Sequence, residues 1–148
     1  MKTPRTLILL AAARDLRLLR SDGVGKGLDE LAHLTWDDLP DVDFEFSDRA
    51  PRERGGLGGS LHTIDPRQTE REKERGRMAA HAIRVLGEEW AKGGYDRIVM
   101  SAPDKMLGLL RAAMPRELAA NIAADIDKDL VKIPLHDLAG HLEAVVKF

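Results

Sequence analysis

Four glycines fall within five positions in the stretch RGGLGGS, residues 54–60. Glycine-rich loops let backbone N–H groups approach a phosphate closely, because no side chain stands in the way. A Walker loop also requires Gly-Lys-Ser/Thr at the start of a helix, and a dinucleotide fingerprint requires G-x-G-x-x-G directly after a strand. The stretch fits neither pattern. It predicts either a mobile arm that brings backbone close to a ligand or an unstructured surface loop.

Positive charge surrounds this stretch. Residues 49–77 contain eight Lys and Arg against five Asp and Glu, a net charge of +3 in a chain whose net charge is -2. Arg67, Arg71 and Arg75 are spaced four residues apart and share one face if the segment is helical. Such a face beside a glycine loop could bind a phosphate backbone. The alternative is a solvated helix whose arginines pair with the intervening glutamates.

A second group of residues with chemical potential lies near the C-terminus. Asp125, Asp127 and Asp129 stand at alternate positions, so on a strand they share one face. Two-metal phosphoesterases need paired carboxylates of this kind. A calcium loop does not fit, because Leu130 stands where that loop requires glycine. The aspartates predict either a divalent-metal site or an acidic outer face of an edge strand.

The absence of cysteine and the spacing of the histidines exclude other chemistries. The chain has no cysteine, which rules out disulfides, thiolate metal sites and thiol catalysis. None of the five histidines forms an i, i+4 pair or an HExxH motif, so a zinc site is not expected. His62 lies near Ser60, but no neighbouring residue would orient it as the base of a nucleophile pair.

The elements that position these residues follow from the apolar pattern. Strands are expected at residues 7–12, 16–20, 28–36, 95–102 and 122–129. Helices are expected at 65–91, at 104–114 and from Pro134 onward, with a short turn or helix at 116–121. The pattern also allows a short strand at 42–46, and it shows no period from Ser47 to Ile64. In the second strand, Arg17 and Arg20 are expected to face solvent.

The helix that begins at Asp65 divides into two halves. Its first three turns, from Gln68 to Arg77, contain no large apolar residue. Its later turns contain the apolar stripe, which consists of Ala79, Ala82, Ile83, Leu86 and Trp90. We therefore expect the first half to project from the body of the protein, with the glycine-rich loop at its base.

Composition and element order are typical of a single α/β domain. The chain has 148 residues, of which 43% are hydrophobic, enough for a substantial core. Strands alternate with helices in the second half, whereas the first strands are joined by short turns, so we expect a mixed, layered sheet. The apolar run at 7–13 imitates a short signal peptide, but it continues into a second strand pattern. No run reaches the ~18 apolar residues of a membrane span, and we expect a cytoplasmic protein without membrane segments.

Several motifs resemble the bacterial host-attachment protein family. They are LILLAAARDLRLLR, SDRAPRERGGLGG, DPRQTEREKERGRMAAHAIRVL, YDRIVMSAPDKMLGLLRAAMP and IAADIDKDLVKIPLHDLAGHL. That family is similar to the middle domain of archaeo-eukaryotic peptide-chain release factors, in which a Gly-Gly-Gln loop precedes a long charged helix. The resemblance implies one domain over residues 1–148, with a mobile loop at about 47–65. It also implies a three-layer, ribonuclease-H-like fold with a mixed sheet.

The resemblance also bears on function. The tripeptide Gly55-Gly56-Leu57 has leucine where the release factors have glutamine. Since peptidyl-tRNA hydrolysis needs a water positioned by that arm, we expect no catalysis. Phosphate contacts need only arginines and backbone N–H groups, so binding to the ribosome or tRNA is still expected.

The sequence thus predicts a non-catalytic RNA- or ribosome-associated factor without a cofactor, able to form homo-oligomers. Its candidate nucleic-acid-binding residues are Arg52, Arg54, Gly55, Gly56, Gly58, Gly59, Arg67, Arg71 and Arg75. One alternative is a metal-dependent phosphoesterase that uses Asp125, Asp127 and Asp129. Another is a protein-interaction factor in surface attachment.

Overall fold

The computed structural model describes residues 4–23, 27–39 and 66–142, apart from the side chains of 66–68. The strands are β1 (Thr6–Ala11), β2 (Asp15–Ser21), β3 (Asp29–Thr35), β4 (Arg97–Ala102) and β5 (Ile122–Asp127). They form one sheet in the order β3-β2-β1-β4-β5. β1, β2 and β3 pair antiparallel, whereas β4 is parallel to β1 and to β5. The predicted mixed sheet is confirmed.

The helices also follow the sequence pattern. They are η1 (Trp36–Asp38), α2 (Pro66–Ala91), α3 (Asp104–Ala113), α4 (Arg116–Ala119) and α5 (Leu135–Leu142). The third strand ends at Thr35 instead of continuing through Trp36. The Thr35 N–H donates to Asp38 Oδ2 at 2.8 Å, which turns the chain into the 3-10 helix η1. The strand predicted around 42–46, the loop at 47–65 and the Asp65 cap lie outside the described residues.

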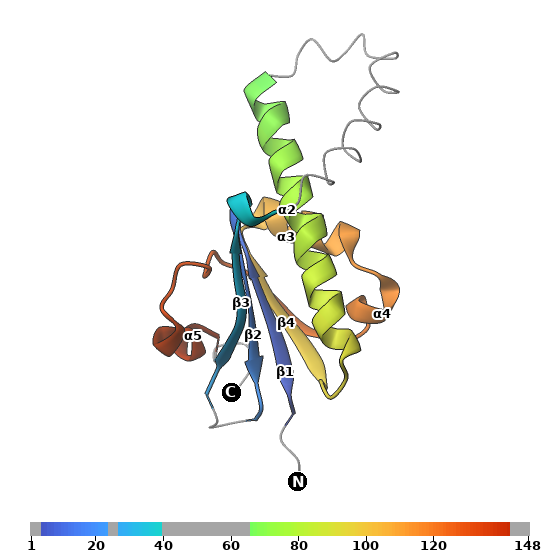
Figure 1. Cartoon of the computed structure of the whole chain (residues 1–148), viewed down its shortest axis with the longest axis vertical. Coiled ribbons are helices and arrows are strands. Elements are labelled where there is room, and N and C mark those ends of the chain that lie inside the picture. The colour runs from blue at the N-terminus through green and yellow to red at the C-terminus, as the bar shows by residue number, and fades with distance from the viewer. Residues whose placement is uncertain (1–3, 24–26, 40–65, 143–148) are drawn as a thin grey trace.

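Three layers result from the alternation of side chains along the central strand. Leu7 and Leu9 of β1 belong to the core cluster that α2 and α3 cover, whereas Ile8 and Leu10 belong to the cluster beneath α5. Figure 1 shows α2 and α3 on one face of the sheet and α5 on the other. The predicted three-layer α/β architecture is therefore confirmed. No helix among the described residues is long and apolar enough to cross a membrane.

One expected solvent-facing residue is buried instead. Arg17 of β2 is only 6% exposed and donates to Glu30 Oε1 at 2.6 Å. It also donates to the backbone oxygens of Val131 and Ile133, at 3.1 and 2.6 Å. These carbonyls belong to the segment that joins β5 to α5, so Arg17 fixes that segment against the sheet. The prediction that Arg17 faces solvent was wrong because this segment covers its side of the strand.

α2 is much longer than the strands against which it packs. Its 26 residues span about 39 Å, whereas a six-residue strand spans about 20 Å. Figure 1 shows its first turns extending beyond the end of the sheet, which confirms the predicted projection. The projecting part is shorter than predicted, because Arg77 is only 9% exposed and Met78 is fully buried. We call residues 66–76 of α2 the stem.

Candidate nucleic-acid interface

The stem presents its arginines on the side of α2 that farther along the helix packs into the core. Arg71 is exposed and Arg75 is half-buried. Arg75 precedes Ala79 by four residues and Ala82 by seven, and both alanines are buried. Positions four and seven apart share a helix side, so the two arginines continue the buried stripe beyond the end of the sheet. We call this arginine-bearing side of the stem its underside.

The other charges of the stem lie elsewhere around the helix. Lys73 is exposed and stands two residues from Arg75, which places it about 200° around the helix axis. Glu70 and Glu74 are four residues apart and share a third side. Glu72 precedes Arg75 by three residues and Glu74 follows Arg71 by three, so both glutamates border the underside. The two arginines form the middle of the underside, with a glutamate on either side of them.

At its base, the stem is attached to the body through Trp36. The guanidinium of Arg77 lies 4.8 Å from the centroid of the Trp36 ring, and that of Arg14 lies 5.3 Å from it. Arg14 Nη1 also forms an ion pair of 3.1 Å with Glu74 Oε2. Arg77 Nη2 donates to the backbone oxygen of Leu39 at 3.5 Å. We call Arg14, Trp36, Glu74 and Arg77 the latch.

Sequence reasoning missed the latch. It counted Arg77 among the cations of the basic segment and gave Arg14 and Trp36 no functional role. The only signal was the rarity of tryptophan, which occurs twice in the chain. Pattern analysis could not pair Trp36 with arginines that lie in other elements.

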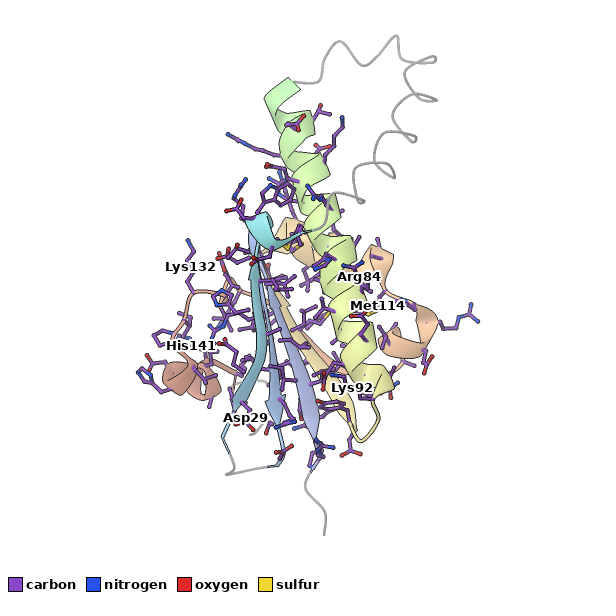
Figure 2. All side chains as sticks on the ribbon, viewed as in Figure 1. Asp29, Arg84, Lys92, Met114, Lys132 and His141 are labelled. Carbon is purple, nitrogen blue, oxygen red and sulfur yellow. The ribbon has the colours of Figure 1, made fainter. Side chains whose placement is uncertain are left out.

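A hollow of about 520 Å³ lies at the same end of the sheet. Its lining comes from the turn between β1 and β2, from η1 and from the segment after β5, and includes Arg14, Asp15, Trp36, Asp129 and Lys132. This is the carboxyl end of β1, the region where ligands bind in many open α/β sheets. The charged residues of its lining have both signs. In Figure 2, Lys132 of this lining lies on the face of the sheet opposite to Arg84 of α2.

The three C-terminal aspartates do not form a metal-binding group. Asp125 and Asp127 lie in β5 at alternate positions, as predicted, but the strand ends at Asp127 and Asp129 lies beyond it. Arg111 Nε donates to Asp125 Oδ2 at 2.8 Å, and this hydrogen bond lowers the pKa of Asp125. Within residues 4–23, 27–39 and 66–142, no three His, Asp or Glu side chains are placed to hold a metal ion.

Only part of the predicted interface can be located. Arg71 and Arg75 lie together on the underside of the stem, as described above. Arg67 lies in the first turn of α2, and its side chain is outside the described part. The loop residues Arg52, Arg54, Gly55, Gly56, Gly58 and Gly59 also lie outside it.

Two solved structures resemble this chain along most of its length. A structure described as an archaeal protein matches with a TM-score of 0.52 and 14% identity, over 96% of this chain and 34% of that one. An archaeal translation termination factor, aRF1, matches with a TM-score of 0.49 and 12% identity, over 96% of this chain and 35% of that one. The chain thus spans about a third of each of these proteins. No curated protein matches it.

Comparison with family models identifies the protein family. The model that matches covers residues 5–142, which include the whole sheet, the stem and every helix described above. It therefore covers nearly all of the chain and confirms the relationship to release factors that the sequence motifs predicted. With the fold, the order of elements and this match in agreement, the chain belongs to bacterial archaeo-eukaryotic release factor family 12.

Proposed function

We propose that this protein binds structured RNA of the translation machinery, tRNA or ribosomal RNA, through the underside of its stem. The observation that carries the proposal is the position of Arg71 and Arg75 on one side of a helix that extends past the sheet. The family name supports the connection to translation. Arg67 and the glycine-rich loop belong to the same predicted interface, and they lie outside the described side chains.

The charge distribution predicts how the binding depends on salt and on RNA sequence. The whole chain carries a net charge of -2, so attraction to RNA has to come from a local surface. Arginine contacts to phosphates position a protein on its ligand but do not distinguish bases. Double-stranded RNA is recognised mostly by its shape and its backbone. We therefore expect salt-dependent binding with little sequence preference.

The proposed role does not include a chemical reaction. The sequence resemblance matches Leu57 to the glutamine of the release factors, and a leucine side chain offers no hydrogen bond to orient a water molecule. We therefore expect no hydrolysis of peptidyl-tRNA. An attachment role stays a separate prediction.

The test compares two charge reversals on the same stem. Arg75→Glu and Lys73→Glu change the net charge equally, but Arg75 lies on the underside and Lys73 about 200° away from it. Binding of fluorescent tRNA and of ribosomal subunits is measured by anisotropy and by co-sedimentation over a series of salt concentrations. Arg75→Glu should weaken binding about tenfold or more, since tenfold is the lower end of what one charge-assisted hydrogen bond is worth, and should reduce the salt slope by at least about 1. Lys73→Glu should have a much smaller effect.

Two results would contradict the proposal. One is the absence of tRNA and subunit binding at low salt. The other is an equal loss in both variants, which would indicate general electrostatic attraction rather than a defined surface.

A further inference from the structure

We infer that Trp36, held between Arg14 and Arg77, positions the stem: it fixes the tilt and the rotation at which α2 leaves the body. The direction of the stem is a property of the free protein and is tested without a ligand. Only the consequence for RNA binding rests on the proposed function.

Packing holds the body half of α2 but not the stem. The buried apolar stripe of the helix begins at Met78, and residues 69–76 contain no large apolar side chain. Toward the stem, the apolar burial of α2 therefore stops at Met78, and the next residue, Arg77, is buried beside Trp36 instead. The direction of the turns beyond this residue therefore depends on the helical backbone and on the contacts at the base of the stem.

The helix also has a weak point where this packing ends. Gly76 is the residue before Arg77, and a Cβ added there would meet nothing within 4 Å. Glycine inside a helix costs conformational entropy, and no close packing at this position compensates for it. A bend at Gly76 would swing the stem away from the direction that the body half of α2 sets.

The latch spans this weak point. Glu74 lies on the stem side of Gly76 and pairs with Arg14, whereas Arg77 lies on the body side and contacts Trp36. Arg14 connects the two contacts because it touches both Glu74 and the Trp36 ring. An ion pair this exposed is weak alone, since Arg14 is 58% exposed, but here its arginine also rests on the ring. The latch thus joins both sides of Gly76 to one ring at the end of β3.

The position of the latch also sets the rotation of the stem. Glu74 and Arg77 are three residues apart and share a helix side, which faces Trp36. Arg71 and Arg75 lie on the neighbouring side. Holding Glu74 and Arg77 against the body therefore fixes where the underside points.

The experiment measures the direction of the stem with two spin labels. The chain has no cysteine, so Glu70→Cys on the stem and Glu117→Cys on α4 provide the only labelling sites, and both positions are exposed. The distance distribution between rigid nitroxides is recorded by pulsed electron resonance. Residue 70 lies about 10 Å along the helix from Arg77, so a tilt of about 20° moves the label by roughly 4 Å.

Two variants break the latch and a third is the matched control. Trp36→Leu removes the ring without changing the charge, and Arg14→Gln removes an exposed arginine that is not needed for the core. Lys73→Gln removes a charge from another side of the stem. We expect a shift or broadening of roughly 4 Å in the first two variants and none in the control. Adding Gly76→Ala to either variant should narrow the distribution again, since alanine resists bending.

Circular dichroism checks that each variant is folded. Unchanged distances in folded Trp36→Leu and Arg14→Gln would overturn the inference, and if Trp36→Leu does not fold, Arg14→Gln decides alone. Because no RNA is present, a failure here leaves the proposed function in place, and failure to bind RNA leaves this inference in place.

Discussion

The two halves of α2 have the same helical period but depend on different forces. In the body half, the side that faces the sheet consists of Met78, Ala82 and Leu86, all fully buried. In the stem, Arg71 and Arg75 lie on the same side, with Glu74 at its edge. Burial of apolar surface stabilises the first half, whereas the second is held by its own backbone hydrogen bonds and by the latch. A change of residue type along one unbroken stripe is thus enough to turn a core helix into a projecting surface.

The largest expected effect comes from a large-to-small substitution in the body half. Leu86→Ala should destabilise the protein by about 2–5 kcal/mol, because it leaves a cavity at a fully buried position. The matched substitution in the stem, Arg71→Ala, should change the free energy of unfolding by no more than about 0.5 kcal/mol, since Arg71 is exposed. Urea unfolding followed by circular dichroism measures both. Similar losses would mean that the stem contributes to the core, contrary to the difference between the halves.

A second substitution tests whether the stem works through its direction. Trp36→Leu leaves every charge in place, so any loss of RNA affinity has to come from geometry. We expect roughly a threefold to tenfold loss in tRNA binding, of the same order as the removal of one phosphate contact. Trp90→Leu is the control, because Trp90 lies at the other end of α2, stacked on Tyr95. Equal losses in the two variants would point to general destabilisation.

A third substitution should strengthen the weaker half. Gly76→Ala should stabilise the protein by about 0.5–1 kcal/mol, because alanine lowers the entropy cost of the helix and its Cβ meets no neighbour. Gly87→Ala, in the body half, places a Cβ 3.7 Å from Leu118, an ordinary contact, and serves as the comparison. Thermal unfolding measures both changes. A destabilised Gly76→Ala protein would show that the helix needs its glycine at this point.

The smallest effect concerns the far end of α2, where Tyr95 is the single tyrosine of the chain. Burial, and then the hydrogen bond that Tyr95 donates to Glu89 Oε2 at 2.7 Å, raise the pKa of Tyr95 to about 12. The stability that this environment contributes is therefore complete below pH 10 and is lost as the pH rises from 10 toward 12. Ultraviolet titration of tyrosinate measures the pKa directly. Glu89→Gln should lower it toward 10, and an unchanged value would assign the whole shift to burial.

The sequence alone determined most of the framework. The continuous apolar run of β1 requires cover on both faces, and Pro66 and Asp104 mark where two helices begin. The absence of large apolar residues from Gln68 to Arg77 was sufficient to predict a projecting helix. Each of these features is local, because periodicity, proline geometry and burial preference act within one element.

Tertiary structure alone decided which charged residues are available at the surface. In the sequence, nothing distinguishes Arg17 and Arg77 from Arg71. In the structure, carbonyl oxygens and a ring from distant segments surround Arg17 and Arg77. Arg14 and Glu74 meet although they are 60 positions apart in the chain. Likewise, Asp129 does not lie in the predicted row of aspartates, because β5 ends at Asp127. Whether a side chain is paired or exposed depends on partners brought together by folding, which no local pattern contains.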